Sequence, residues 1–332
     1  MTRYIIRRLL ISIPVLLVGT FLAYVLVASS GDPIAGLAAR PGVTQAVLDN
    51  ARHQLGLDQD IFHRYWHWLT HFVTGDWGVS IALGQGGAPV FSTIMHALWT
   101  TIRIVIGAEL IALVLGMAVG VLAAVKQYSV FDYIATTAAF VLFSMPIFCV
   151  AIILKYYAIQ FNDVLVSWGF NRWLTTAGPP TGGFSGSFGE QIIQYTGTFL
   201  LPTVSIMVIS FAAYSRFQRA SMLETLNSDY VRTARAKGIS GSRVIFRHAY
   251  RNALIPVITL FSLNFGVGFT GAIVTERVFG WHGMGSVLVA AVEQYDPDML
   301  MGFLVVTAIL IVLFNLLADI VYGFLDPRIR IG

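Results

Sequence analysis

The sequence predicts an all-α polytopic membrane protein with six transmembrane helices. Of its 332 residues, 56% are hydrophobic and only 11% are charged, and the mean hydropathy is +0.74. Soluble globular domains carry roughly 25% charged residues, so a surface this poor in charge is suited to lipid. Six stretches are long enough to cross a bilayer, which takes about 20 apolar residues per helix. Their continuous apolar character excludes barrel strands, in which polar and apolar residues alternate.

The predicted spans follow one another along the chain. The first has no charged residue, although three arginines precede it as in a signal peptide. Because the apolar core of a signal peptide is only about 7–15 residues long, we interpret this longer run as a retained helix. The second contains Glu109, and the other four are uncharged apart from Lys155 next to the third. The six spans cover residues 9–31, 104–125, 133–154, 191–215, 252–275 and 299–318.

The distribution of Lys and Arg predicts the orientation, because these residues accumulate in cytoplasmic loops. If the N-terminus lies in the cytoplasm, fourteen of them fall in inside segments and five in outside segments. Eight of the fourteen lie in the loop 216–251 alone. Both termini are therefore predicted to be cytoplasmic, as an even number of crossings requires.

The first outside loop is too long to be a simple connection. Apolar residues recur in it at steps of three and four from Ile61 to Val73, which indicates a helix with one apolar face, and Gly75 is expected to end it. We therefore expect a small folded cap at residues 32–97. The second outside loop, 161–190, is rich in Gly and Pro and is expected to be irregular. The chain then divides into residues 1–31 with the first span, the cap, and a core over 98–332 that includes the inside loop 216–251.

Several classes of site are not supported by the sequence. There is no phosphate-binding loop of the P-loop type and no GxSxG motif, so the chain is not expected to be an enzyme or to bind ATP. The single cysteine, Cys149, excludes a disulfide or a thiolate zinc site within the chain. His63, His67 and His71 share a helix face but lack an HExxH pattern, so no metal is expected. The pI near 9.2 is explained by basic inside loops and does not require nucleic acid.

A signalling or scaffold membrane protein is one alternative function. An intramembrane enzyme such as a protease is another. It would need a Ser–His or paired-Asp site at bilayer depth. The spans contain Ser but almost no His and no paired aspartates, which disfavours this alternative.

The inside loop 216–251 is the most informative segment. Its positive charge is explained by membrane topology alone. Topology does not explain its pattern of two helical stretches joined by a small-residue break at 238–241. Ser228 or Asp229 can cap the helix that starts at Tyr230. A helix, a glycine break and a second helix on the inner surface predict a docking element for a soluble partner.

The residues of this loop closely resemble the cytoplasmic loop of ABC importer permeases, in particular the peptide-transporting branch. The resemblance rests on the run from Tyr230 to Gly238, followed by a second run from Arg251 to Pro256. Two residues depart from the general importer pattern: Arg232 replaces a Glu and Thr233 replaces an Ala. The resemblance implies that a short helix here inserts into a groove of an ATPase subunit. The residues concerned are Arg232, Thr233, Ala234, Arg235, Ala236, Lys237 and Gly238.

The resemblance extends over nearly the whole chain. Segments similar to those of peptide permeases occur in order at 31–33, 55–58, 64–68, 75–80, 144–148, 275–285 and 326–330. It implies a type I ABC importer permease fold and the role of a B-type permease subunit that moves oligopeptides or dipeptides by alternating access. Nickel, haem or glutathione are alternative substrates within the same family.

The partners that the resemblance implies are a second homologous permease, two ATP-binding subunits that use ATP, and an extracytoplasmic solute-binding protein. Membrane lipid surrounds the complex in the inner (plasma) membrane of a bacterium or archaeon. No cofactor is expected on this chain, and no nucleic acid.

Polar residues in or beside the spans are candidates for the transport pathway or a gate, because they are costly in lipid unless they are paired. Asn264, Glu276 and Asn315 are the candidates, with structural hydrogen bonding between helices as the alternative for the two asparagines. Arg103 and Glu109 are not on one helix face, so their partners are expected on other helices or on a second subunit.

Three further residues beside the spans carry simpler expectations. Lys155 and Asp319 lie near span ends and are expected to extend toward the interfaces. Pro146 is expected to kink the third span.

Overall fold

The computed structural model describes residues 2–32, 34, 38, 42–54, 56–80, 87–180, 183–268 and 272–325. These residues are almost entirely helical, and the strands β1 (Val79–Ser80) and β2 (Ala88–Pro89) pair antiparallel. The helices are α1 (Thr2–Ser30), α3 (Gln45–Gln54), α4 (Ile61–Thr74), α5 (Val90–Val125), α6 (Val130–Ser144), α7 (Ile147–Ser167), α8 (Phe188–Leu226), α9 (Asp229–Ala236), α10 (Gly241–Arg243), the π-helix η1 (Val244–Ala249), α11 (Tyr250–Ala253), α12 (Ile255–Gly268), α13 (Ile273–Phe279), α14 (Met284–Glu293) and α15 (Pro297–Leu325).

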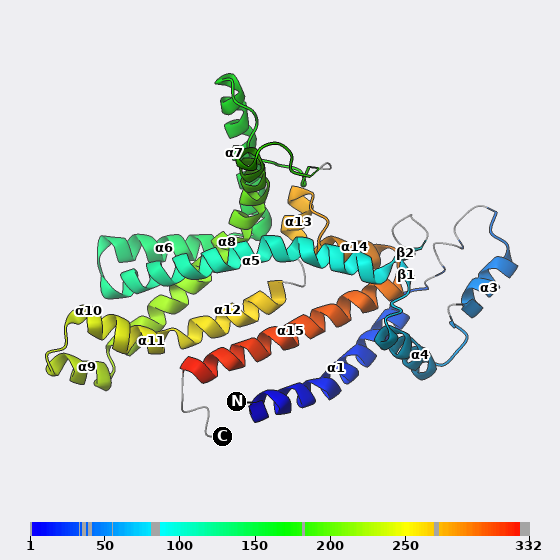
Figure 1. Cartoon of the computed structure of the whole chain (residues 1–332), viewed down its shortest axis with the longest axis horizontal. Coiled ribbons are helices and arrows are strands. Elements are labelled where there is room, and N and C mark those ends of the chain that lie inside the picture. Colours follow the sequence, from blue (N-terminus) through cyan, green and yellow to red (C-terminus); the bar gives the residue numbers. More distant parts are fainter. Residues whose placement is uncertain are drawn as a thin grey trace.

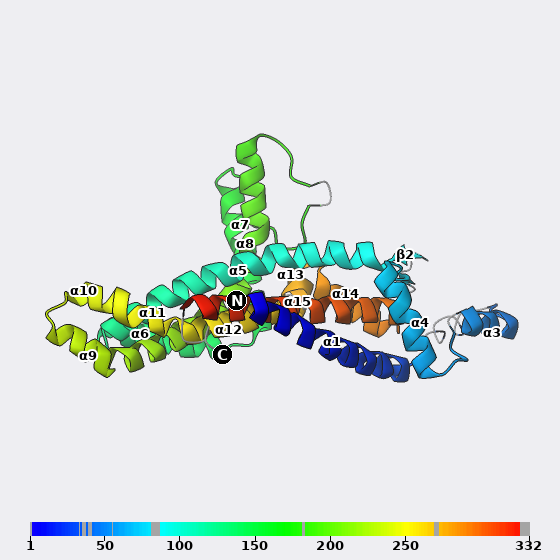
Figure 2. The same cartoon turned by 60° about the horizontal axis from the view of Figure 1, so that its bottom comes forward.

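The long helices define two opposite ends of the molecule (Figure 1). α1, α5, α12 and α15 run roughly side by side, together with α6 and the later part of α8. One end carries α9, α10 and α11, and we call it the loop end. The other carries α3, α4 and the two strands, and we call it the cap end. Figure 2 shows the same separation from a second direction.

Helix length and apolar composition support the predicted number of spans. Among the described residues, five helices are long and apolar enough to cross a membrane, and α12 and α13 form a sixth crossing if the pair, bent by 56°, is one span. The five are Ile5–Ser30, Val90–Val125, Ile147–Ser167, Phe188–Leu226 and Pro297–Leu317. The all-α polytopic fold is therefore confirmed, although the fifth predicted span is two helices and not one.

The predicted boundaries of the third span are wrong. Residues 133–154 straddle a break, because α6 ends at Ser144 and α7 begins at Ile147. Pro146 does not kink a continuous helix; it occupies the N-cap of α7, where its missing N–H costs nothing. α7 and the first part of α8 pack together and project from the other helices in both views (Figures 1 and 2).

The cap helix α4 forms where the apolar pattern predicts it. The Asp60 carboxylate accepts a hydrogen bond from the N–H of His63 at 2.9 Å and caps the first turn. Gly75 ends the helix at φ +94°, a left-handed conformation that favours glycine. Tyr65 is buried against α1, where its hydroxyl lies 2.9 Å from that of Thr20. The predicted helix and its end at Gly75 are thus confirmed.

α5 and α8 form the most extensive helix pair of the described chain. Two glycines on α5 allow it. A Cβ placed on Gly116 would lie 2.7 Å from the Cβ of Tyr214, and one on Gly120 would lie 2.6 Å from the carbonyl oxygen of Ser215. The backbones therefore approach closely, as small residues permit between helices in lipid.

Charged residues inside this helix layer have partners within the chain. Glu109 is buried on α5 and accepts hydrogen bonds from the Ser210 hydroxyl, at 2.7 Å, and from the Tyr214 hydroxyl, both on α8. The expectation of a partner on another helix is confirmed for Glu109. The guanidinium of Arg103 lies 5.3 Å from the centre of the Trp99 ring on its own helix, and a partner for Arg103 on a second subunit stays a prediction.

The two residues expected to extend toward the interfaces are instead held by specific partners. The Lys155 ammonium donates to the carbonyl oxygen of Val278 at 2.8 Å and so joins α7 to α13. Asp319 lies 2.7 Å from the guanidinium of Arg8 and joins α15 to α1. These contacts form because a charged side chain near lipid is stabilised more by a fixed partner than by extending toward the interface.

Candidate functional site

Residues 229–253 form a compact unit at the loop end, between α8 and α12 (Figure 1). We call it the loop unit; it contains α9, α10, η1 and α11. Ser228 takes the N-cap position of α9 through its extended backbone, while its hydroxyl donates to the carbonyl oxygen of Thr225 at 2.6 Å. Asp229 in the first turn favours the helix through its charge. The predicted helix–break–helix arrangement is present, with the chain turning at Gly238.

The loop unit packs on α5 and α8 through its own apolar cluster. Val231 and Ala234 of α9 are buried there, with exposed fractions of 0% and 6%. The cluster consists of Val121, Ala124, Met222, Val231, Ala234, Val244, Ala249 and Ala253. The resemblance places Ala234 among the residues that contact a groove of a partner subunit. That expectation is wrong, because α9 uses this face to attach the unit to the chain itself.

The opposite face of the loop unit is basic and solvent-exposed. Arg232, Thr233, Arg235, Ala236, Lys237 and Gly238 are all exposed. Arg232 approaches Asp229 only to 4.0 Å, and both side chains are more than half exposed. Gly238 has φ +75° and no atom within 4 Å of the position a Cβ would take. This face presents three cations beside an open, left-handed turn, which suits an acidic protein surface.

Hydrogen bonds stiffen the unit and join it to the long helices. The amide of Asn252 donates to the Tyr230 hydroxyl at 2.8 Å and closes α11 onto α9. The Tyr250 hydroxyl donates to the sulfur of Met117 on α5 at 3.6 Å. Burial raises the pKa of Tyr250, so its hydroxyl stays neutral and can keep this contact. These contacts connect α9 to α5 and α8, so the loop unit can move with these two helices without unfolding.

An ion pair that the sequence did not reveal lies just behind the loop unit. Asp132 at the start of α6 is 2% exposed and receives two hydrogen bonds from Arg219 of α8, Nε to Oδ1 at 2.6 Å and Nη2 to Oδ2 at 2.8 Å. Such bidentate pairing fixes direction as well as distance. Arg219 was counted only as one of the basic residues of the inside loop. The available signal was Ser129, which caps α6 three residues before Asp132.

Replacing Asp132 by alanine should destabilise the protein by on the order of 2 kcal/mol, since the change leaves a partly buried guanidinium without its carboxylate. The side chain of Arg219 is 26% exposed, so solvent offsets some of that cost. A lower Tm of the purified protein would show it. The double variant with Arg219→Ala should lose less than the two single variants together. Additive losses would mean that the pair contributes nothing as a pair.

The three predicted pathway residues lie on three different helices. Glu276 is fully buried in α13, where it accepts hydrogen bonds from the Thr101 hydroxyl at 2.7 Å and from the N–H of Ser286 at 3.1 Å. Asn264 on α12 lies close to the Tyr214 hydroxyl of α8. Asn315 on α15 lines a cavity of about 190 Å³ against α1. Each side chain therefore joins helices or lines a helix boundary, and their roles in a pathway or gate stay predictions.

Glu276 is part of a wider network that sequence reasoning missed. Thr101 on α5 accepts a hydrogen bond from the N–H of Met284 at 2.8 Å while donating to Glu276. The network ties α13 and α14 to α5 near the cap end. Across the part of the chain that the structure describes, no group of three or more His, Cys, Asp or Glu could hold a metal ion.

Comparisons of the sequence match two families of binding-protein-dependent transport membrane components, which together cover nearly the whole chain. Residues 116–331 match the family described as “Binding-protein-dependent transport system inner membrane component”. Residues 1–107 match a family described as “Binding-prot-dependent transport system membrane comp, N-term”. One match ends and the other begins inside α5.

Curated relatives and one solved structure agree with this match. The chain is 34% identical to the oligopeptide transport system permease protein OppB of Mycobacterium tuberculosis (strain H37Rv), with all of both chains covered. It is 37% identical to AppB of Bacillus subtilis, covering 99% of this chain and 100% of that protein, and 35% identical to the dipeptide permease DppB of Escherichia coli K12, covering 99% of each. The inward-facing MetNI methionine ABC transporter covers 72% of this chain and 98% of the solved chain, with a TM-score of 0.52 at 16% identity, which supports a shared fold.

Proposed function

Because the chain belongs to the family of binding-protein-dependent transport system inner membrane components, we propose that it is the permease subunit of an ATP-driven importer of oligopeptides or dipeptides. The observation that carries this proposal is full-length similarity to three permeases whose names give peptides as their cargo. The protein is a multi-pass protein of the bacterial inner membrane. Its hydrophobic helices form the passage, and energy comes from elsewhere.

The energy source is a separate ATPase that docks on the loop unit. Membership of the family implies ATPase and binding-protein partners. The exposed basic face of α9 supplies the contact, because three cations and an open turn at Gly238 can meet acidic residues at the edge of a groove. A second homologous permease and a pair of ATPase subunits would complete the complex. The sequence has no phosphate-binding loop, so this chain does not hydrolyse ATP itself.

The function is tested by reconstituting the full complex in vesicles with its binding protein and following uptake of labelled dipeptides and longer peptides. Uptake should need ATP, the ATPase subunits and this chain together. Glutathione belongs in the same assay, because the chain is also 35% identical to the glutathione permease protein GsiC of Escherichia coli. Nickel and haem complete the panel. Uptake of glutathione, nickel or haem alone would replace the peptide assignment, and ATP hydrolysis by the isolated chain would contradict the permease assignment.

The loop end should face the cytoplasm and the cap end the outside, as the basic residues indicate. A cysteine at Asp58 tests this, because that side chain is 50% exposed in the cap, where it contacts His53 at 3.0 Å. An impermeant thiol reagent added from outside should label Asp58→Cys in intact cells. A cysteine at Arg235 of α9 should stay unlabelled until the membrane is opened. The reverse pattern would invert the orientation.

A further inference from the structure

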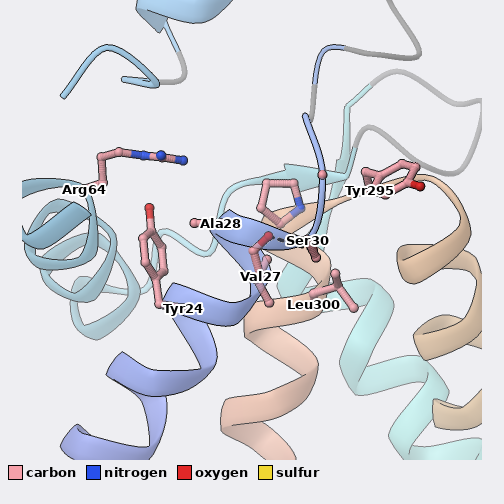
Figure 3. A pocket seen from close by; sticks show the side chains of 9 residues that line it. Tyr24, Val27, Ala28, Ser30, Arg64, Tyr295 and Leu300 are labelled. Atoms are coloured by element: carbon pink, nitrogen blue, oxygen red, sulfur yellow. Dashed lines mark hydrogen bonds between the residues drawn. The ribbon is translucent and has the colours of Figure 1, made fainter. Parts of the chain in front are cut away.

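A cavity of about 360 Å³ lies at the cap end, between the cap, α1 and α15. A smaller cavity of about 20 Å³ adjoins it and shares the side chains of Tyr24 and Arg64 (Figure 3). Neither contains any of the predicted pathway residues. The larger cavity is lined by Tyr24, His53, Gly56, Leu57, Gln59, Arg64, His67, Trp68, His71, Asp76, Trp77, Gly78, Pro297, Asp298 and Met301.

Aromatic rings place this cavity at the level of lipid headgroups. Tyr24 of α1 contacts Trp68 of α4 at 6.0 Å between ring centres, Trp68 contacts Phe72 at 5.2 Å, and Phe72 stacks on Trp77 at 4.2 Å. Belts of Trp and Tyr are typical of the boundary between hydrocarbon and water. They are found here where the apolar helix α1 reaches its end.

The outward face of α4 fits the same position. Trp66 and Val73 are 65% and 76% exposed on this helix, whereas Phe62 stacks on Phe21 of α1 at 5.1 Å between ring centres. A helix that buries one aromatic face against α1 and exposes apolar residues on the other is suited to lie in the membrane surface. The cavity behind α4 therefore opens among headgroups.

One side of the cavity carries positive or protonatable groups. The guanidinium of Arg64 lies 6.0 Å from the centre of the Tyr24 ring, and Figure 3 shows it above the hydroxyl end of that residue. The Nε of Arg64 is buried and has no hydrogen-bond partner among the described residues. The imidazoles of His67 and His71 stack at 4.1 Å beside it. A donor without an acceptor suits an anionic oxygen supplied from outside the chain.

The other side carries two carboxylates. Asp298 stands in the first turn of α15 against the backbone of Gly78, where a Cβ would lie 2.4 Å from Oδ2. Asp76 accepts a hydrogen bond from the N–H of Gly78 at 3.2 Å. Basic and acidic side chains thus line one cavity, and the described residues form no ion pair between Arg64 and these carboxyl groups.

We propose that this cavity binds the headgroup of a phospholipid that carries a primary ammonium, with the phosphate toward Arg64 and the ammonium between Asp76 and Asp298. Trp77, whose ring stacks on Phe72, lies between the two aspartates in the sequence and lines the cavity. The chemistry recognised is a zwitterion, which a free dipeptide also offers. The interfacial position of α4 favours the lipid as its source.

Native mass spectrometry of the purified full transporter tests this proposal by counting lipids retained from equimolar phosphatidylethanolamine and phosphatidylcholine. The two headgroups differ only in N-methylation, so the ammonium alone is compared. The wild type should retain phosphatidylethanolamine about tenfold more strongly, as hydrogen bonds to charged groups imply. Asp298→Asn and Asp76→Asn should remove this preference, Arg64→Gln should weaken retention of both lipids, and Asp49→Asn, an exposed cap residue outside the cavity, should change neither.

Equal retention of the two lipids by the wild type would overturn the proposal, and this comparison does not depend on any variant folding. A preference that survives both aspartate variants would also overturn it, because the ammonium would then bind elsewhere. Displacement of phosphatidylethanolamine by a soluble dipeptide at matched concentration would reassign the cavity to free zwitterions and end the lipid assignment.

Discussion

Replacement of Gly120 by leucine is expected to keep the protein from accumulating in the membrane. A Cβ at this position would lie 2.6 Å from the carbonyl oxygen of Ser215, 2.7 Å from the Cβ of Gln218 and 3.1 Å from the N–H nitrogen of Arg219. Two of these atoms belong to the backbone of α8 and have no rotamer to change. Overpacking typically costs about 1–3 kcal/mol and more where backbone must move. The largest helix pair of the structure would separate.

The matched control is Gly19→Leu, because Gly19 also lies in a predicted span and has nothing within 4 Å of its Cβ position. The yield in the membrane fraction and the monodispersity in detergent should fall strongly for Gly120→Leu. Both should stay near the wild-type values for Gly19→Leu. Equal yields would show that α5 and α8 do not pack as described.

Apolar patterning predicts which segments cross the membrane but not where a crossing breaks. Residues 133–154 are apolar throughout, so hydropathy alone gives one span. Pro146 interrupts it because a proline cannot continue the hydrogen-bond ladder of α6, yet it starts α7 without cost. Hydropathy does not distinguish a kinked helix from two successive helices, since both have the same composition. The packing of α7 on α8 decides that question.

The candidate site shows the same division between local pattern and tertiary contact. The helix, the break at Gly238 and the basic face are local, and the sequence predicts them. The face of α9 that packs against the rest of the chain is determined by tertiary contacts. A spacing of four residues relates Ala234 to Gly238 on an ideal helix, but α9 ends at Ala236 and Ala234 is buried in the chain's own cluster.

Pairs such as Asp132 with Arg219 lie beyond the reach of local pattern for a similar reason. Their partners are separated by 87 positions, and only the packing of α6 on α8 brings them together. Glu276 and Thr101 meet in the same way across 175 positions.

Replacement of Gly238 by tryptophan is expected to abolish uptake while the helices remain inserted. Gly238 has φ +75°, which costs an L-residue roughly 1–2 kcal/mol. The surrounding space is open, so an indole would project from the turn that follows Arg235 and Lys237. It would hold an ATPase surface away from these cations. Transport assays should show at least about a tenfold loss, the factor that 1.4 kcal/mol of lost docking gives, and the ATPase should no longer copurify.

Gly183→Trp is the matched control, because Gly183 has φ +71° and nothing within 4 Å but lies on the opposite side of the spans. Ser187 would be a poorer control, since it forms the capping box of α8 with Glu190. Gly238→Asn adds a second comparison: asparagine tolerates the left-handed region and is small, so uptake should largely survive. If Gly238→Trp transports and retains the ATPase as Gly183→Trp does, the loop unit serves topology alone and the docking surface lies elsewhere on the chain.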